Sequence, residues 1–129
     1  DGNEVPVLMA ASIHGRLDVV EALLQAGADV DKVANNGATA LMWACYAGDA
    51  AIVVTLLQAG ADVDKAANDG VTALMAASAN GHDAIVEALL QAGADVDKAA
   101  NDGNTALIWA SQNGHNAVVK VLKKAGAKR

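Results

Sequence analysis

The sequence predicts an all-α solenoid, in which short helix–turn–helix units stack side by side and are joined by tight turns. The first observation behind this prediction is a repeat: the segment Leu56–Gly70 recurs letter for letter at Leu89–Gly103, 33 residues later. A slightly altered copy begins at Leu23. The second observation is that each unit holds two helical patterns of about ten residues, which are marginal in isolation. Neighbouring units must therefore bury each other's apolar faces.

Four units align without gaps, and we expect residues 1–129 to form a single domain. The units span residues 3–35, 36–68, 69–101 and a shortened 102–129. We expect the first and last units to act as caps, because terminal units of such arrays need a more soluble outer face. Val5-Pro6-Val7 and Lys123-Lys124 are interpreted as these end modifications.

Each unit shows start and stop signals for two helices. The first helix follows a threonine, such as Thr72, whose hydroxyl is suited to cap a helix N-terminus. The second helix has apolar pairs at helical spacing, such as Ile85/Val86 with Leu89/Leu90. It ends at a glycine, which tolerates the left-handed conformation beyond a helix C-terminus; these glycines are Gly27, Gly60, Gly93 and Gly126. An Asn-Gly or Asp-Gly turn then opens the next unit.

Composition and charge exclude several classes of function. Hydrophobic residues make up 53% of the chain, but it has no Phe, two Trp and one Tyr, which suits thin, closely packed helices. Residues 1–119 hold four basic and fifteen acidic residues, a net charge of −11, so nucleic acid is not an expected partner. No apolar run reaches about 18 residues and no targeting signal is visible. We therefore expect no membrane association and a cytoplasmic or recombinant intracellular location.

The repeated unit resembles the ankyrin repeat family, whose signature is T-P-L-H-x-A with a period of 33. The signature position contains Thr39-Ala-Leu-Met-Trp-Ala, Thr72-Ala-Leu-Met-Ala-Ala and Thr105-Ala-Leu-Ile-Trp-Ala. The match extends through Gly81-His82 and Gly93-Ala94-Asp95-Val96, and it covers nearly the whole chain. The resemblance implies an L-shaped helix–turn–helix stack with a β-hairpin projecting from each junction.

The chain departs from the family pattern at three positions in each repeat. The signature Pro is replaced by Ala40, Ala73 and Ala106, and the signature His by Met42, Met75 and Ile108. The second change should remove hydrogen bonds that the family's His makes along the stack. The Asp that often opens the family's turn is replaced by Ala34, Ala67 and Ala100.

Residues capable of catalysis or metal binding are few. The single Cys45 cannot form an internal disulfide, and one Cys with His14, His82 and His115 does not provide a zinc site. We interpret His82 and His115 as structural residues at helix starts. The recurring pairs Asp29/Asp31, Asp62/Asp64 and Asp95/Asp97 are interpreted as solvated turn acceptors rather than calcium ligands. One position of the repeat is interpreted as a site for a small buried residue; it holds Ser12, Cys45, Ser78 and Ser111. We expect no enzyme activity, metal or cofactor.

The candidate binding residues are found mainly where otherwise matching units disagree. Ankyrin repeats typically bind partners with their hairpin tips and the exposed side of the first helices, and the variable positions fall on those elements. The predicted partner-binding residues are Val5, Ile13, His14, Asn36, Ala38, Trp43, Tyr46, Asp69, Val71, Asn80, Asp102, Asn104, Trp109, Gln112 and Asn113. Trp43 and Tyr46 are three residues apart and share a helix face. Trp43 and Trp109 are either binding anchors or core residues packed between repeats.

The favoured function is a non-catalytic, monomeric scaffold that binds another protein through its concave face. The near-identity of the junctions indicates a consensus-derived, engineered or very recently duplicated array, and we favour an engineered origin. Two alternatives remain. The chain could be a stability scaffold without a partner, or it could bind a small molecule between Trp43, Tyr46 and a neighbouring unit.

Overall fold

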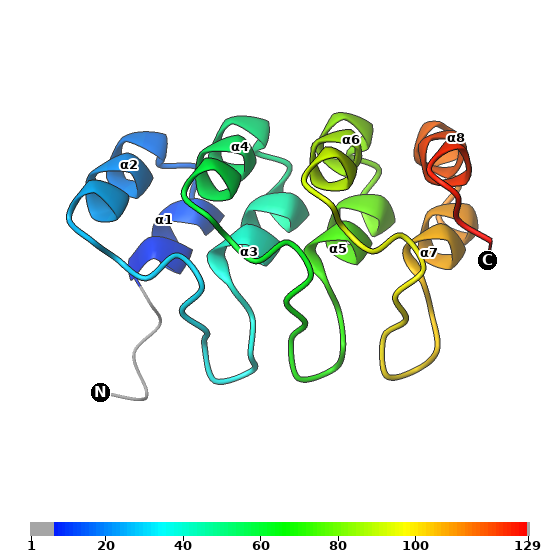
Figure 1. The fold of residues 1–129 in the computed structure, drawn as a ribbon, viewed down its shortest axis with the longest axis horizontal. Helices are drawn as coiled ribbons and strands as arrows, with labels where there is room; N and C mark the ends of the chain where they lie inside the picture. Colours follow the sequence, from blue (N-terminus) through cyan, green and yellow to red (C-terminus); the bar gives the residue numbers. More distant parts are fainter. Residues whose placement is uncertain (1–6, 129) are drawn as a thin grey trace.

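The computed structural model describes residues 7–128, and this part of the chain contains eight α-helices in two layers (Figure 1). The first helices of the repeats are α1 (Val7–Ile13), α3 (Ala40–Ala47), α5 (Ala73–Ala79) and α7 (Ala106–Gln112). The second helices are α2 (Leu17–Gln25), α4 (Ala50–Gln58), α6 (Asp83–Gln91) and α8 (Asn116–Lys124). The second helices form one row above the first helices, and the loops between repeats project away from both rows (Figure 1). The predicted all-α solenoid is confirmed.

The predicted threonine caps form at the first helices of the last three repeats. The Thr39 hydroxyl oxygen accepts a hydrogen bond from the Met42 backbone N–H at 3.3 Å, and Thr72 accepts one from Met75 at 3.4 Å. Thr105 caps α7 in the same way. These bonds satisfy backbone donors that the first turn of a helix leaves unpaired.

The predicted glycine stops also form, and α6 shows their geometry. Gly93 has a φ of 96°, and its N–H donates to the Leu90 carbonyl oxygen at 3.0 Å. The next N–H, from Ala94, donates to the Leu89 carbonyl oxygen at 3.0 Å. This pair of bonds is the Schellman motif, which requires the left-handed conformation that glycine adopts without steric cost.

Each junction forms a short hairpin, as the family resemblance implies. In the hairpin between α4 and α5, the Ala67 N–H donates to the Val71 carbonyl oxygen at 2.9 Å. The Gly70 N–H donates to the Ala67 carbonyl oxygen at 2.8 Å, and Gly70 has a φ of 84°. This is a turn followed by a left-handed glycine. The pairing is confined to isolated antiparallel bridges, Ala66 with Thr72 and Ala99 with Thr105, in the described residues. Alanine at the family's Asp position thus still permits the turn.

The core lies between the two layers and runs the length of the stack. Each first helix packs against the first helices on either side, and the second helices pack against them and against each other. Leu56, Leu89 and Leu122 occupy the same position in successive repeats, and all three are fully buried. Full burial of such a side chain stabilises a fold by about 1.5–3 kcal/mol. The expected mutual burial of apolar faces is confirmed.

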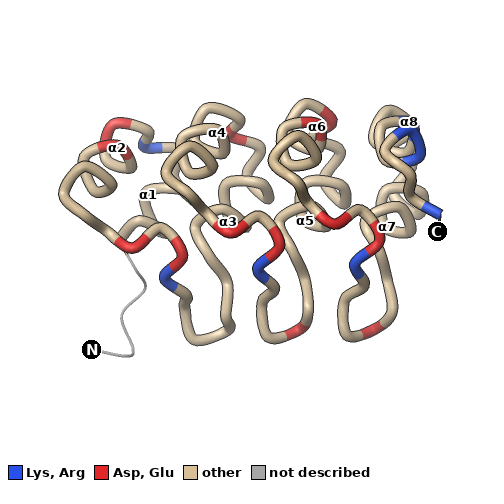
Figure 2. Tube along the Cα trace, viewed as in Figure 1, with Lys and Arg blue, Asp and Glu red and all other residues tan. Residues whose placement is uncertain are grey.

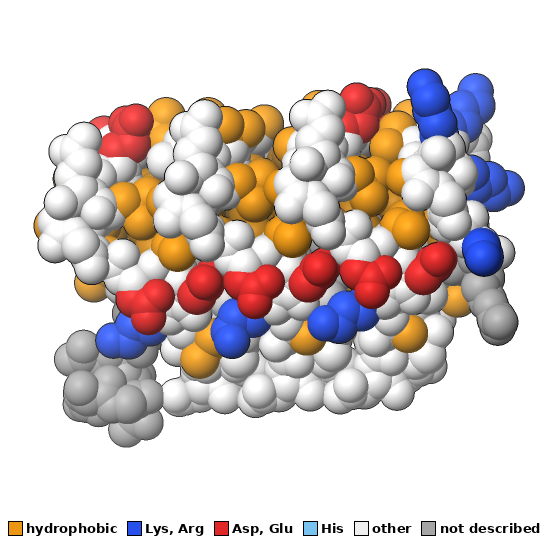
Figure 3. Space-filling view, viewed as in Figure 1, with side chains coloured by type: hydrophobic (Ala, Val, Ile, Leu, Met, Phe, Trp, Pro, Cys, Tyr) orange, Lys and Arg blue, Asp and Glu red, His pale blue; other side chains and the backbone are white. Residues whose placement is uncertain are grey.

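Aspartate side chains hydrogen-bond successive repeats to one another. Asp62 Oδ1 accepts from the Asp64 N–H within its own turn, at 3.1 Å. Asp64 Oδ1 then accepts from the Asp95 N–H of the next repeat, at 2.8 Å. Corresponding bonds join Asp31 to Asp62 and Asp97 to Lys128. A row of acidic side chains crosses one face of the molecule at this level (Figure 3). The turn-acceptor interpretation is confirmed for the first member of each pair, Asp29, Asp62 and Asp95. The second members, Asp31, Asp64 and Asp97, instead accept from the next repeat, which was not predicted.

Asparagine and histidine add further bonds between repeats. Asn101 Nδ2 donates to the Asn68 carbonyl oxygen at 2.9 Å, and Asn68 Nδ2 donates to Asn35 at 3.2 Å. His115 Nε2 lies 3.0 Å from the Ala79 carbonyl oxygen of the preceding repeat. The sequence correctly placed His82 and His115 at helix starts, but neither side chain makes a capping hydrogen bond. Their rings instead contact the repeat before.

The ends of the stack differ in charge (Figure 2). Lys123 and Lys124 are exposed in the last turn of α8, where cations interact favourably with the helix dipole. Val5-Pro6, which we interpreted as part of the first cap, lies outside the described residues. Within residues 7–128, no helix is long and apolar enough to cross a bilayer.

Candidate functional site

The predicted partner-binding residues differ in how much surface they offer. Val5 lies outside the described residues. Tyr46 at the end of α3 is 57% exposed and Ile13 is 38% exposed, and most of the polar members are exposed as well. Ala38 is only 6% exposed, so it offers a partner much less surface than expected. Ala38 belongs to the buried core cluster and immediately precedes the buried Thr39 cap.

The aromatic residues of α3 form a pair. The ring centroids of Trp43 and Tyr46 are 5.8 Å apart, and the ring planes meet at 81°. Such an edge-to-face arrangement is favoured by the ring quadrupoles. Trp43 is half-buried and packs against the core, as does Trp109 in α7, while Tyr46 is exposed. Trp43 therefore belongs partly to the core, and the rest of its side chain is exposed to solvent.

An open groove of about 320 Å³ lies beside this pair, between the second and third repeats. We call it the aromatic groove. α3 contributes Met42, Trp43 and Tyr46 to it, and α5 contributes Ala76. The two flanking hairpins contribute Asn36, Ala38, Ala67, Asp69 and Val71. Six of the predicted partner-binding residues thus meet at one place, although they come from two repeats.

Met42, Ala67 and Ala76 line the aromatic groove but were not among the predicted binding residues. Ala76 could have been found from the 33-residue repeat, because it is the residue of the third repeat that corresponds to Trp43 in the second. A tryptophan there would occupy space that alanine leaves free. Among the described residues, the predicted binding residues of the first and last repeats do not line the aromatic groove. His14 lines a separate open groove of about 280 Å³ beside α1.

Hydrogen bonds fix the hairpin tips that form the rim of the aromatic groove. Asn36 Oδ1 accepts from the Ala38 N–H at 3.0 Å, and Asp69 Oδ1 accepts from the Val71 N–H at 3.1 Å. These bonds are Asx turns, in which the side chain folds back onto the backbone two residues later. The Asn68 N–H also donates to the Asn36 carbonyl oxygen at 2.9 Å, which ties one tip to the next. These bonds fix the conformation of the rim.

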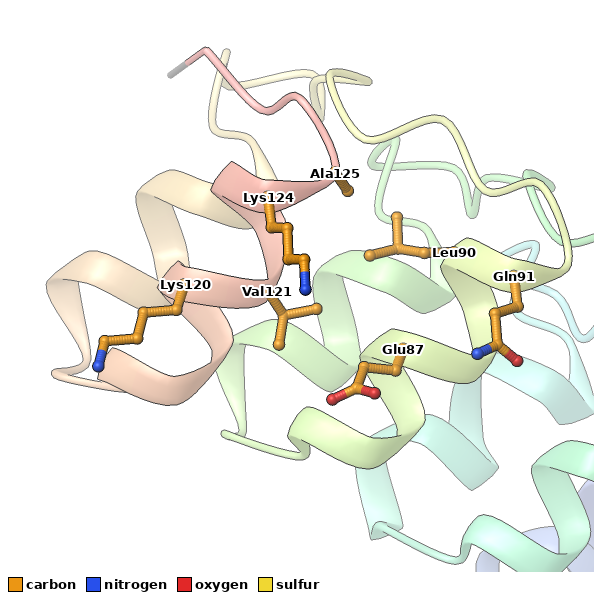
Figure 4. Close-up of a pocket in the computed structure, with 7 residues that line it drawn as sticks. All are labelled: Glu87, Leu90, Gln91, Lys120, Val121, Lys124 and Ala125. Atoms are coloured by element: carbon orange, nitrogen blue, oxygen red, sulfur yellow. The ribbon is translucent and has the colours of Figure 1, made fainter.

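A second groove of about 350 Å³ lies between α6 and α8 (Figure 4). Leu90 and Val121 supply its apolar part, while Glu87 on α6 and Lys124 on α8 place opposite charges on its two sides. Sequence reasoning missed this groove entirely. One difference between repeats could have indicated it: Val121 replaces the alanine, Ala88, that the preceding repeat has at this position.

The groups with chemical reactivity are either buried or isolated. Burial raises the pKa of the Cys45 thiol well above its ordinary value, so its nucleophilic thiolate form is suppressed. Asp18 is exposed, and its pKa is lowered first by the Val19 backbone N–H and then by Arg16, whose Nε lies 3.5 Å away. In residues 7–128, no three His, Cys, Asp or Glu side chains lie close enough together to hold a metal ion. Ser111 is exposed, unlike the buried Ser12 and Ser78 at equivalent positions.

Comparison with known sequences identifies the repeat. The family model described as ankyrin repeats (3 copies) matches residues 1–67 and again residues 52–128. No curated protein sequence gives a significant match. Together the two matches cover residues 1–128, nearly the whole chain. The chain belongs to the ankyrin repeat family.

Proposed function

We propose that this chain is a non-catalytic scaffold that binds another protein through its concave face, with the aromatic groove as the anchor site. Ankyrin repeats generally mediate protein–protein interaction and are typically not enzymes. The observation that most supports the finer proposal is the exposed Tyr46 ring, held edge-to-face with Trp43 beside a groove of about 320 Å³. Aromatic residues next to a pocket dominate the binding energy of many protein interfaces.

The rigidity of the stack supports the same proposal. Aspartate and asparagine side chains bond each hairpin to the next, and His82 and His115 bond neighbouring helix pairs. A surface that is ordered before binding loses little conformational entropy when a partner docks. More of the free energy gained from each aromatic contact then remains as binding affinity.

A small molecule is a weaker candidate for the aromatic groove. Pockets for small ligands usually span about 300–1,000 Å³ and bury most of the ligand surface. The groove is at the lower end of this range and open to solvent, so a small ligand would remain largely hydrated. A protein partner can instead insert one side chain while its neighbouring residues cover the rim. We also propose that the nearly identical junctions reflect a consensus-derived or engineered array.

Selection from a random 12-residue peptide display library against the immobilised chain tests the protein-binding proposal. Selected peptides are then measured against Trp43→Ala and Tyr46→Ala. These variants install the residues that the third repeat carries at the same positions, Ala76 and Ala79, so the fold should tolerate them. We expect each variant to weaken binding by more than about 1 kcal/mol, or roughly fivefold in Kd.

The control is Val54→Ala, which alters an exposed residue of α4 that does not line the aromatic groove. It should leave binding unchanged. Selected peptides that bind both aromatic variants as tightly as the unmodified chain would place the binding surface elsewhere. A selection that yields no binder would favour a scaffold without a partner. Thermal melting of each variant checks that the stack remains folded.

A further inference from the structure

We propose that the aromatic groove takes an arginine side chain from the partner protein, with its guanidinium against the Trp43–Tyr46 pair and hydrogen-bonded to Asp69. This inference rests on the proposed function and names the chemistry of the partner. It requires three properties of the groove: a negative electrostatic environment, an accessible aromatic ring face, and a carboxylate with free acceptor capacity.

The electrostatic environment favours a cation. Asp69 is the only charged residue among the residues that line the aromatic groove, and none of them is Lys or Arg. Residues 36–101, the two repeats that form the groove, contain eight Asp or Glu residues and two Lys residues. One of these two, Lys98, donates from Nζ to the Asp64 carbonyl oxygen at 3.0 Å. An incoming cation therefore meets the field of an acidic body.

The aromatic pair can bind a guanidinium group. A cation is attracted to the face of Trp or Tyr within about 6 Å of the ring centroid. In the edge-to-face arrangement of Trp43 and Tyr46, the contact covers at most one face of one ring. Tyr46 is 57% exposed, so its ring remains accessible. The planar guanidinium of arginine can stack on such a surface, whereas the compact ammonium of lysine cannot.

Asp69 supplies the complementary anion. Its Oδ1 atom accepts the Asx-turn hydrogen bond from Val71 at 3.1 Å, and the residue is exposed. An ionised carboxylate has about four acceptor sites, so the turn leaves capacity for a guanidinium donor. Arginine presents five donors in a rigid fork, which lets it stack on an aromatic ring and bond a carboxylate at once. Asp69 and the Trp43–Tyr46 pair line the same groove, which places both partners within one site.

Nuclear magnetic resonance with defined peptides tests the inference. The blocked peptide Ac-Ala-Ala-Arg-Ala-Ala-NH2 is titrated into the 15N-labelled chain, and the indole N–H signals of Trp43 and Trp109 are followed. Parallel titrations replace Arg by citrulline, Lys or Leu. Citrulline has nearly the shape of arginine but no charge. We expect the Arg peptide to shift the Trp43 signal with a roughly millimolar Kd, at least fivefold tighter than citrulline or Lys, while Trp109 stays unshifted.

The repeats provide a matched pair of charge variants. Asp69→Asn should weaken Arg-peptide binding at least threefold, whereas Asp102→Asn, at the same position one repeat later, should change it less than 1.5-fold. Asn36 occupies this position in the preceding repeat and makes the same Asx turn, so both variants should keep their hairpins. Equal effects of the two variants, equal binding of Arg and citrulline, or an unshifted Trp43 signal would overturn the inference.

The display selection separates this inference from the proposed function. If the selected peptides need Trp43 and Tyr46 but lack arginine, or if the Leu peptide shifts Trp43 more than the Arg peptide, the arginine assignment fails and the scaffold function stands.

Discussion

Leu89→Ala should destabilise the stack strongly, and the adjacent Leu90→Ala should do so only mildly. Both leucines lie in α6, so the two substitutions change the helix propensity equally. Their burial differs. Leu89 has no exposed surface, because it points into the core between the two helix layers. Leu90 is half-buried and lines the open groove between α6 and α8 (Figure 4).

The magnitudes follow from this difference in burial. Truncating Leu to Ala removes three carbon atoms, which at about 0.8 kcal/mol per buried methylene costs about 2.4 kcal/mol at Leu89. A residual cavity of about 50 Å³, at about 24 cal/mol per Å³, adds about 1.2 kcal/mol. The expected loss at Leu89 is therefore about 3.6 kcal/mol. At Leu90 about half of the transfer free energy is lost and no closed cavity forms, so we expect about 1.2 kcal/mol.

Urea unfolding followed by circular dichroism at 222 nm measures both losses. With a slope of about 2 kcal/mol per M, the midpoint should fall by about 1.8 M for Leu89→Ala and about 0.6 M for Leu90→Ala. Tryptophan fluorescence provides a second probe, because a repeat stack can lose cooperativity when one interior unit is weakened. A loss at Leu89 no larger than the loss at Leu90 would refute the assignment of the α6 face that stacks into the core.

Further predictions concern a glycine, a serine and the cysteine. Gly81→Ala should cost about 2–3 kcal/mol, because Gly81 has a φ of 77° and an added Cβ would lie 2.7 Å from the next histidine ring. Gly93→Ala, with a similar φ but nothing within 4 Å, should cost only about 1–2 kcal/mol; equal melting shifts would contradict the ring contact. Ser78→Ala should leave stability unchanged or raise it by up to about 1 kcal/mol, because its buried hydroxyl has no hydrogen-bond partner among residues 7–128. Ser12→Ala should instead lower the free energy of unfolding by about 1 kcal/mol, because it removes the hydrogen bond that the Ser12 hydroxyl donates to the Leu8 carbonyl oxygen. Chemical denaturation of the two serine variants measures this difference. Burial and a raised pKa should make Cys45 react with a thiol reagent at pH 8 at least 100-fold more slowly in the folded chain than in urea; equal rates would contradict the buried position.

The sequence alone determined the local structure of each repeat. The threonine caps, the glycine stops and the apolar pairs act within a few residues of chain, so their patterns directly specify where helices begin and end. The period of 33 then determined that identical units repeat the same contacts. For this reason the helix pairs, the turns and the buried leucine positions could all be predicted before the structure was known.

Only the tertiary structure decided how neighbouring units meet. The Asp64–Asp95 bond and the contact of His115 with Ala79 join residues 31 and 36 positions apart, and their geometry depends on the offset between stacked repeats. The same offset buries Ala38 and brings Asp69 beside the Trp43–Tyr46 pair to form one groove. The sequence shows which residues differ between repeats. The distance between two repeats depends on how their side chains pack together, and this packing exists only in the folded stack.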